Sequence, residues 1–508
     1  MAVTGLDPLP NLGLARAAPA SPIRPAKTRK CPIRAEILLF PCRPGRHTSE
    51  AREVPPMTDE SDRFSARAAR HLRVGAHVGG AAARIAGARL LGGSTNDAQS
   101  AATLTAALGR LKGPLMKVAQ MLATIPDVLP AEYAESLAQL QAHAPPMGSA
   151  FVKRRMQAEL GPNWRGRFAA FDLTPAAAAS LGQVHRAQAE DGTQLACKLQ
   201  YPDMASAVEA DLKQLDLILG LHRRMRPAID TREVGKEIAA RLREELDYRR
   251  EARHAVLYAE ILAPFADIRV PRVQTELSTA RLLTMEWLDG RPLASCLAAD
   301  EAERNKIGAA LFKAWWCPFS HYGVIHGDPH LGNYTVSGSE GRAEGINLFD
   351  YGCIRIFPPR FVAGVVDLYQ GLRQNDRARI VHAYESWGFR SLAKEAIEAL
   401  NIWAHFIYGP LLDDRTRTIA DGVAPGLYGR REAFAVHKAL QAHGPVVVPR
   451  EFVFMDRAAI GLGAALLHLG AKLNFHRMFN AAIENFDAAT LSARQSSALA
   501  KAGLTAPL

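Results

Sequence analysis

The sequence predicts an α+β fold of two lobes, in which a small β-rich lobe precedes a larger helical lobe. Two observations indicate this order. A strong hairpin signal, Asp191-Gly192, separates two short runs of alternating apolar residues between positions 183 and 201. From Pro358 to about residue 494, the apolar residues mostly follow helical spacing. With 508 residues, 48% of them hydrophobic, the chain is long enough to bury large cores.

The N-terminal region differs in composition from the rest of the chain. Residues 1–56 contain nine Lys or Arg, four Asp or Glu and many prolines without an amphipathic repeat, so we expect no fold there. Our hypothesis is that Met57 is the natural start, and an Arg-rich organelle transit peptide is the alternative. The predicted parts are a disordered tail or misassigned start (1–56), a helical N-terminal extension (57–147), the small lobe (148–287), the core of the helical lobe (288–360), its helical C-terminal part (361–494) and a flexible tail (495–508).

The small lobe is predicted to carry a lysine on the second strand of its hairpin. Lys198 alternates with Leu195, Cys197 and Leu199, and therefore faces away from these apolar side chains. The A-C-K sequence has the small-x-Lys form of the strand on which protein kinases hold the α and β phosphates of ATP. Taken alone, a lysine on the solvated face of an edge strand is the alternative.

The segment before this hairpin has the position of a phosphate-covering loop. Such a loop normally contains glycines, but this chain has Ala177, Ala178, Ala179 and Ser180 in the sequence A-A-A-A-S. Alanine excludes much of the φ > 0 space that glycine allows. We therefore expect a stiffer loop at this end of a nucleotide site.

A helix over residues 233–260 is predicted to supply a carboxylate that pairs with Lys198. Its apolar residues recur every four positions, and its acidic residues include Glu245, Asp247 and Glu251. At about 100° per residue, Asp247 and Glu251 share a face, whereas Glu245 and Asp247 lie about 200° apart. One face can serve Lys198, and the other must serve a different partner.

An apolar strand at residues 281–288 is predicted to connect the two lobes. Met285 and Trp287 on this connection are the expected neighbours of adenine. A helix at residues 311–322 then leads into the next motif.

The most specific motifs lie in the helical lobe, where H-G-D-P-H-L-G-N at 326–333 is followed by D-Y-G at 350–352. Asp328 and Asn333 are five residues apart (333 − 328), as in the catalytic loop of protein kinases, and Asp350 stands where those enzymes bind metal. Carboxylate and amide oxygens are the hard ligands that Mg²⁺ accepts. Either motif alone would be an ordinary turn. The ordered pair predicts Mg²⁺-ATP binding, with Asp328 accepting the proton of the nucleophile.

Together these motifs resemble the UbiB/AarF family of atypical kinase-like proteins, whose eukaryotic members support coenzyme Q biosynthesis. The resemblance rests on A-A-A-S, E-L-D-Y-x-x-E-A, H-x-D-P-H-x-G-N and D-Y-G, and covers the chain from near residue 105 to near residue 360. It implies a bilobal protein-kinase-like fold with helical N- and C-terminal extensions, and it implies ATP and Mg²⁺ as cofactors.

The resemblance also implies roles for single residues at the centre of the site. Lys198 and Glu251 would form an ion pair, and Asp328 would be the catalytic Asp. Asn333 and Asp350 would ligate Mg²⁺.

A regulatory set is implied by the family's N-terminal K-x-G-Q motif, which corresponds to K-V-A-Q at 117–120. Lys117 and Gln120 would lie across the entrance that a protein substrate normally uses. Lys117 would meet Glu245, which forms an E-x-D pair with Asp247. Ala at position 119 replaces the family Gly and bears on how closely this segment packs over the nucleotide.

The sequence after D-Y-G, C-I-R-I-F-P-P-R-F, contains no A-P-E motif of the kind with which protein kinases bind peptides. We therefore expect slow ATP hydrolysis, or phosphorylation of a small or lipid-like molecule, in support of ubiquinone biosynthesis. The alternatives are a small-molecule kinase of the aminoglycoside or choline kinase type and a nucleotide-sensing module without turnover.

The expected partners, besides ATP, are an anionic membrane surface and the proteins or lipids of quinone biosynthesis. The net charge of +11 includes arginine clusters without interleaved aromatics, so no nucleic acid is expected. The best apolar run, 458–471, is too short to span a membrane. We expect a cytoplasmic protein, peripheral on the inner face of the membrane, or a mitochondrial matrix protein if the N-terminus is a transit peptide.

Overall fold

The computed structural model describes residues 147–506, apart from a set of short gaps. The gaps are Ser180, 226–231, 390–391, 424–427, 430–431, 433–434, 437 and 440–449. The predictions for residues 1–146, which include Lys117 and Gln120, therefore lie outside the described residues, as does the prediction for Ser180.

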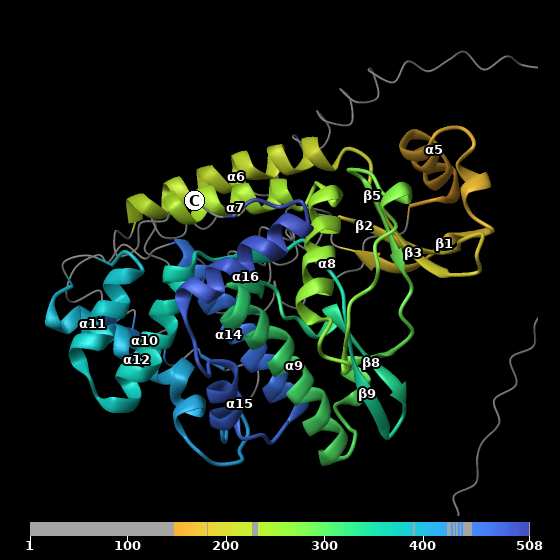
Figure 1. The fold of residues 1–508 in the computed structure, drawn as a ribbon. Coiled ribbons are helices and arrows are strands. Elements are labelled where there is room, and N and C mark those ends of the chain that lie inside the picture. The colour runs from red at the N-terminus through yellow and green to blue at the C-terminus, as the bar shows by residue number, and fades with distance from the viewer. Residues whose placement is uncertain are drawn as a thin grey trace, which may run out of the picture. The chain divides into compact units, whose positions relative to one another are not determined.

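The small lobe is built on one antiparallel sheet of strand order β1-β2-β3-β5 (Figure 1). Its elements are α5 (Ser149–Leu160), η1 (Trp164–Arg167), β1 (Ala170–Ala179), β2 (Gly182–Gln188), β3 (Gln194–Gln200) and β5 (Leu282–Glu286). The hairpin predicted around Asp191-Gly192 is confirmed, because β2 and β3 pair over seven residues with Val184 opposite Lys198. The predicted lobe-connecting strand is β5, which pairs with β3.

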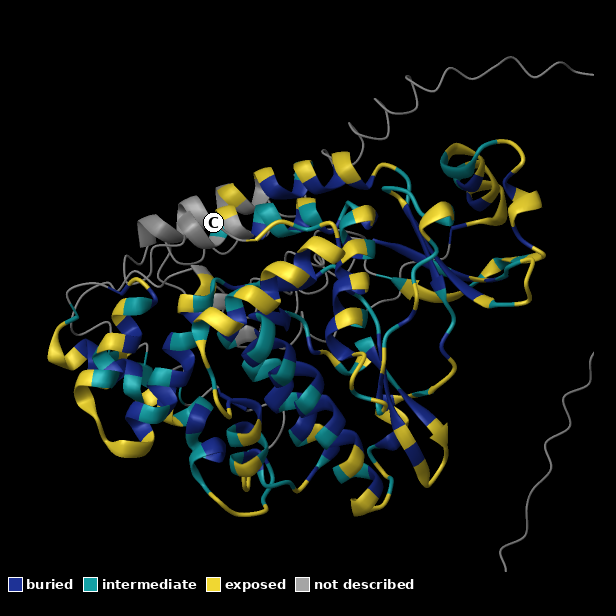
Figure 2. Ribbon diagram, in the orientation of Figure 1, coloured by how far each residue is buried: buried dark blue, intermediate teal, exposed yellow. Residues whose placement is uncertain are grey.

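The two faces of strand β3 contact different cores. Leu195, Cys197 and Leu199 are fully buried in one apolar cluster with residues of α5 and η1. Ala196 belongs to a second cluster, and Lys198 points to the same side as Ala196. Strands β3 and β5 are buried over most of their length (Figure 2). The sheet therefore presents one apolar face and one face that combines apolar residues with a buried lysine.

The predicted single helix over 233–260 is wrong. The chain forms α6 (Met204–Met225), α7 (Arg232–Glu244) and α8 (Tyr248–Leu262), with a break between the last two. Asp247 is the N-cap of α8, and its Oδ1 accepts a hydrogen bond from Arg249 N at 3.0 Å. Aspartate at an N-cap satisfies an otherwise unpaired backbone N–H and favours the start of a new helix there. Asp247 and Glu251 consequently do not share the face that continuous helical geometry assigned to them.

The helical lobe combines many helices with short strands that carry its loops. Its elements are β4 (Ile268–Arg269), β6 (Arg291–Pro292), η3 (Leu293–Cys296), α9 (Glu301–Tyr322), β7 (Val324–His326), η4 (Leu331–Asn333), β8 (Tyr334–Ser339), β9 (Arg342–Leu348), β10 (Ile354–Ile356), α10 (Pro359–Gln374), α11 (Arg377–Ser386), α12 (Lys394–Leu412), α14 (Arg450–Leu469), α15 (Phe475–Ala482) and α16 (Ala488–Lys501). The short helix η2 (Thr275–Leu277) packs against β5 of the small lobe. One sheet has the order β4-β9-β8-β6, and a two-stranded ladder joins β10 to β7. The α+β class predicted from sequence is confirmed.

Helix α9 forms the centre of the helical core and delivers the chain to β7. Asp300 caps its N-terminus by accepting from Glu303 N at 2.7 Å, and Gly323 ends it with a left-handed φ of 64°. Phe312, Trp315 and Phe319 are almost fully buried on this helix. These aromatic side chains therefore fix the strand that follows.

The predicted flexible tail from residue 495 is also wrong, because α16 continues to Lys501. Gln495 is 3% exposed and donates hydrogen bonds to Tyr322 O at 2.7 Å and to Phe357 O at 2.8 Å. Leu499 is buried one turn further on. The many Ala and Ser residues of this helix weaken its apolar pattern, and the long-range contacts of Gln495 have no local sequence signal.

The apolar run at 458–471 lies mostly within α14. Among the described residues, none of the helices has both the length and the apolar character that crossing a membrane requires.

Candidate active site

The β7–β10 ladder brings the two sequence motifs of the helical lobe together. His326 at the end of β7 pairs with Ile354 of β10, and Gly327 N donates to Cys353 O at 3.0 Å. The H-G-D loop leaves β7 at the point where the D-Y-G segment enters β10. Asp328 and Asp350 thus lie at neighbouring ends of paired strands, although 22 residues (350 − 328) separate them in the chain.

His326 connects these two segments directly. Its ring is buried, and Nδ1 accepts from Asp328 N at 3.3 Å. Since Nδ1 is the acceptor, Nε2 carries the proton and donates to Asp350 O at 2.8 Å. Trp315 of α9 donates to His326 O at 3.2 Å and fixes the backbone of the same residue. Sequence reasoning gave His326 no role, although its position two residues before Asp328 was available as a signal.

Asp350 adopts a left-handed backbone conformation, with φ of 60°. Such a φ is uncommon outside glycine, although Asp and Asn tolerate it better than other residues. Asp350 Oδ1 accepts from Gly352 N at 3.2 Å and lies 3.6 Å from Lys198 Nζ. The strained backbone therefore turns the carboxylate toward the lysine of the small lobe.

Asn333 is attached to both motif segments. Its Nδ2 donates to Asp328 O at 2.9 Å, and its backbone oxygen accepts from Phe349 N at 2.9 Å. With Nδ2 engaged in this bond, the side-chain oxygen is the end of the amide that can ligate a cation. Asn333, Asp328 and Asp350 are consequently held by one set of hydrogen bonds around His326.

Lys198 and Glu251 form a buried ion pair. Lys198 Nζ lies 2.6 Å from Glu251 Oε1, and both residues are less than a tenth exposed. Burial lowers the pKa of Lys198, but the carboxylates of Asp350 and Glu251 outweigh it and raise that pKa above its usual value. Burial raises the pKa of Glu251, against the opposing effect of Lys198. Lys198 thus stays protonated between two carboxylates from different lobes.

Glu245 is buried beside the D-Y-G segment, apart from Asp247. Cys353 Sγ donates to Glu245 Oε1 at 3.4 Å. Asp247 is engaged as the cap of α8, so the structure separates the two members of the predicted E-x-D pair. The predicted partner of Glu245, Lys117, lies outside the described residues.

The expected adenine neighbours lie on the same sheet face as Lys198. Met285 is buried with Ala196, Tyr248 and Leu283, and Trp287 packs against this cluster. Because Ala196 pairs with Met285 in the β3–β5 ladder, an apolar surface continues from the lysine to the lobe connection.

The predicted stiff loop at Ala177–Ala179 is wrong as a loop. These residues are the last three of β1, where Ala177 pairs with Val184 and Ala179 pairs with Gly182. Leu181, a buried turn residue, directly precedes β2. Alanine fits an extended strand, which needs none of the φ > 0 values that a glycine-rich loop uses. Strand β1 therefore includes the three alanines that were predicted to form a loop.

The donor set fits Mg²⁺ held together with a phosphate ligand. Within the described residues, no three or more His, Cys, Asp or Glu side chains are grouped so that they could hold a metal ion. Mg²⁺ usually takes one or two carboxylates and completes its octahedral shell with water and phosphate oxygens. The carboxylate of Asp350 and the amide oxygen of Asn333 are enough protein ligands for such an ion. The protonated Lys198 has the charge needed to bind a phosphate group.

Residues 139–384 match the ABC1 atypical kinase-like domain. This domain and the names of the relatives support the resemblance to the UbiB/AarF family that the sequence motifs predicted. Among UbiB/AarF relatives, the chain is 32% identical over 272 residues to the AarF domain-containing protein kinase 1 of Xenopus laevis, covering 53% of this chain and 52% of the relative. It is 28% identical over 352 residues to the atypical kinase COQ8B, mitochondrial, of Rattus norvegicus, covering 66% of each.

A solved structure resembles the fold of this chain. The Mycobacterium tuberculosis protein titled "the complex structure of Rv3197-erythromycin" is 27% identical, with a TM-score of 0.53, and the match covers 76% of this chain and 96% of that one. The chain spans about half to two thirds of the length of the two curated UbiB/AarF relatives. The bilobal kinase-like fold predicted from sequence is therefore confirmed.

Proposed function

We propose that this protein binds Mg²⁺-ATP between its lobes and acts as an ATPase, or as a phosphotransferase for a small or lipid-like molecule, in support of isoprenoid-quinone biosynthesis. One observation carries the proposal. Lys198 of the small lobe contacts Glu251 at 2.6 Å and Asp350 at 3.6 Å, while His326 connects Asp350 to Asp328. This chain of contacts gathers a cation, a metal-binding carboxylate and a candidate base in one place.

Each side chain would have a distinct task. Lys198 would bind the α and β phosphates, with Glu251 orienting its ammonium group. Asp350 and Asn333 would hold Mg²⁺, which neutralises charge on the transferring phosphoryl group when it is bound. Asp328 would accept the proton of the attacking hydroxyl or water.

The chain after D-Y-G supports a small acceptor over a protein. Strand β10 begins at Ile354 and pairs back onto β7, and α10 begins at Pro359. Only Phe357 and Pro358 separate β10 from α10, so the described chain leaves no long segment here on which a peptide could bind. Without such a segment, the site is better suited to water, a small alcohol or the head group of a lipid as the acceptor.

The pathway is proposed from the family. The name of the rat relative, COQ8B, is related to coenzyme Q, and that relative is called mitochondrial. We propose a peripheral location on an anionic membrane surface, where lipid-soluble quinone precursors are present. A matrix location applies if residues 1–56 act as a transit peptide.

The test is a comparison of wild type with Asp328→Asn and, as a matched control, Asp216→Asn, whose side chain is exposed on α6. Purified proteins are assayed for Mg²⁺-ATP binding by thermal shift and for phosphate release. Wild type and the control should bind and turn over, whereas Asp328→Asn should bind without turnover. Binding with no turnover in wild type would favour the nucleotide-sensing alternative, and no binding at all would reject the proposal.

The pathway requires a separate test in cells. A knockout strain is profiled for quinones and complemented with wild type or with Asp328→Asn. Loss of quinone that only wild type restores would support the proposal. Normal quinone levels in the knockout would contradict it.

A second candidate is a small-molecule kinase of the aminoglycoside or choline kinase type. The observation that favours it is the similarity to the Mycobacterium tuberculosis protein Rv3197, which was solved in complex with erythromycin. Incubation of the protein with Mg²⁺-ATP and a macrolide, an aminoglycoside or choline, followed by mass spectrometry, should show a phosphorylated product if this candidate is correct.

A further inference from the structure

Arg186 lies on the face of the small-lobe sheet that carries Lys198. In the β2–β3 ladder, Val184 pairs with Lys198 and Arg186 pairs with Ala196. Side chains alternate along a strand, and paired residues point to the same side of a sheet. Arg186 therefore projects from β2 over the apolar surface that runs toward the lobe connection.

Two residues that follow strand β5 meet Arg186. Its guanidinium carbon lies 4.3 Å from the centre of the Trp287 ring, a cation–π distance. Its Nη2 lies 3.0 Å from Asp289 Oδ1, and the same oxygen accepts from Trp287 Nε1 at 2.9 Å. The three side chains form a closed triangle, named here the 186–287–289 triangle.

The far corner of the triangle is fixed to the helical lobe. Asn347 Nδ2 donates to Asp289 O at 3.1 Å, and Asn347 is fully buried. A Cβ on Gly290 would approach Thr335 Oγ1 to 2.4 Å, so the backbone after Asp289 packs tightly against β8 and β9. Strand β8 begins directly after Asn333, and β9 ends two residues before Asp350. Arg186 is thus connected, through Asp289, to the two strands that adjoin both proposed metal ligands.

The contacts of the triangle are of a kind that opens easily. The side chains of Arg186 and Asp289 are 49% and 84% exposed. Exposed ion pairs contribute little to stability and are screened by salt. The triangle is consequently too weak to hold the two lobes in one arrangement. It can still slow the release of a ligand if that release requires the triangle to open.

We propose that the 186–287–289 triangle is a latch that slows release of nucleotide from the cleft. This inference rests on the proposed nucleotide site. The expected adenine neighbours Met285 and Trp287 lie at the triangle, since Arg186 pairs with Ala196 and Ala196 pairs with Met285. Arg186 is therefore a positioning residue. It affects the dissociation rate of nucleotide and does not contact the reacting atoms.

The experiment measures release of a fluorescent ATP analogue, with Mg²⁺, by stopped-flow displacement with excess ATP from the full-length protein. Arg186→Ala should release the analogue about fivefold faster than wild type, the factor expected for losing one weak exposed contact. Arg186→Lys, which keeps the charge but not the planar group, should give an intermediate rate. Arg165→Ala is the matched control, because Arg165 makes a similar contact with Trp164 away from the cleft.

Two further measurements distinguish a latch from a general structural effect: the release rate of a variant of Asp289, the partner of Arg186, and the dependence of the release rate on salt. Asp289→Ala should match Arg186→Ala, and the double variant should be no faster than either single one. The difference between wild type and Arg186→Ala should shrink as salt rises to about 0.5 M, since the ion pair is exposed. Circular dichroism and melting temperature verify that each variant is folded.

The outcomes distinguish failure of the latch from failure of the nucleotide site. If wild type binds the analogue and both Arg186→Ala and Asp289→Ala release it at the wild-type rate, the latch is wrong while the proposed function stands. If wild type does not bind Mg²⁺-ATP, both proposals are wrong. Should Arg186→Ala fail to fold, Arg186→Lys and Asp289→Ala decide the question by the same rates.

Discussion

His326 and Asp350 are joined from side chain to backbone, with Nε2 of the imidazole 2.8 Å from the carbonyl oxygen of the aspartate. The same ring accepts from Asp328 N through Nδ1. A single neutral imidazole thus uses both nitrogens to hold two loops. Neither the H-G-D loop nor the D-Y-G segment can shift without breaking a hydrogen bond to this buried ring.

Replacement of His326 should loosen both loops together. In His326→Ala, the backbone groups of the half-buried residues Asp328 and Asp350 lose this partner, which costs at most about 1–3 kcal/mol for each group left without a hydrogen bond. We expect a lower melting temperature and lower turnover. His326→Gln, whose Nε2 can still donate to Asp350 O, should recover part of the stability. Equal losses in both variants would contradict the bridging role.

Variants of the Lys198–Glu251 pair should affect stability and ATP hydrolysis differently. Lys198→Met leaves Glu251 buried without its nearest cation, and breaking a buried pair costs about 3–5 kcal/mol. The double variant Lys198→Met/Glu251→Gln removes the uncompensated charge and should regain much of that free energy of unfolding. Neither variant should hydrolyse ATP. Urea denaturation and phosphate release measure the two effects, and recovery of activity in the double variant would refute the role of Lys198.

Asp350→Asn should remove magnesium dependence without unfolding the segment. Asparagine tolerates the left-handed φ of 60° that Asp350 adopts, so the backbone can keep its conformation. The lost carboxylate should abolish the extra thermal shift that Mg²⁺ adds to ATP. A variant that binds Mg²⁺-ATP as tightly as wild type would contradict the metal role.

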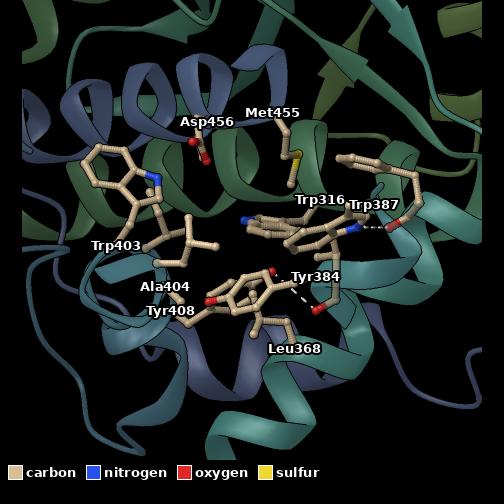
Figure 3. A pocket seen from close by; sticks show the side chains of 14 residues that line it. Trp316, Leu368, Tyr384, Trp387, Trp403, Ala404, Tyr408, Met455 and Asp456 are labelled. Atoms are coloured by element: carbon tan, nitrogen blue, oxygen red, sulfur yellow. Dashed lines mark hydrogen bonds between the residues drawn. The ribbon is translucent and has the colours of Figure 1, made fainter. Parts of the chain in front are cut away.

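Asp456 should make the stability of the helical lobe depend on pH. Its carboxyl group points into a cavity among aromatic side chains that include Trp403 and Tyr384 (Figure 3). Burial raises the pKa of Asp456 from 3.8 to about 8, while the indole N–H of Trp403 opposes the rise in part. Trp403 Nε1 has no hydrogen bond of normal geometry to a described residue.

The raised pKa of Asp456 should make the folded protein less stable as pH increases. Between pH 4 and pH 8 the folded protein binds the proton that the unfolded chain releases, so stability falls as pH rises through this window. The loss by pH 7 is at most ~4 kcal/mol, at about 1.4 kcal/mol for each pKa unit. Asp456→Asn should remove the slope and be more stable than wild type at pH 8, measured by urea denaturation. A slope equal to that of wild type would show that other groups cause it.

Local signals predicted the parts of the site that lie within single strands or loops. The Asp191-Gly192 turn and the alternation around Lys198 located β2 and β3, because hairpin geometry is set by two turn residues and a period of two. The spacing from Asp328 to Asn333 is likewise local. Residues of this kind could be assigned from sequence alone.

The errors arose where one local pattern continued past a structural boundary. Leu246 extends the four-residue apolar repeat of α7, so the capping Asp247 was taken as part of a helix. Its cap signal was present but weaker than the periodicity. The contacts of Arg186 with Asp289 and of Gln495 with Tyr322 span more than a hundred residues each and have no local signature.

The position of Gln495 bears on how the protein is made. Tyr322 O and Phe357 O, which Gln495 binds, flank the ladder that supports the H-G-D and D-Y-G segments. During synthesis, the candidate site therefore lacks this support until α16 has left the ribosome. A chain stopped before α16 lacks both hydrogen bonds, so the H-G-D and D-Y-G segments should be held less firmly in it.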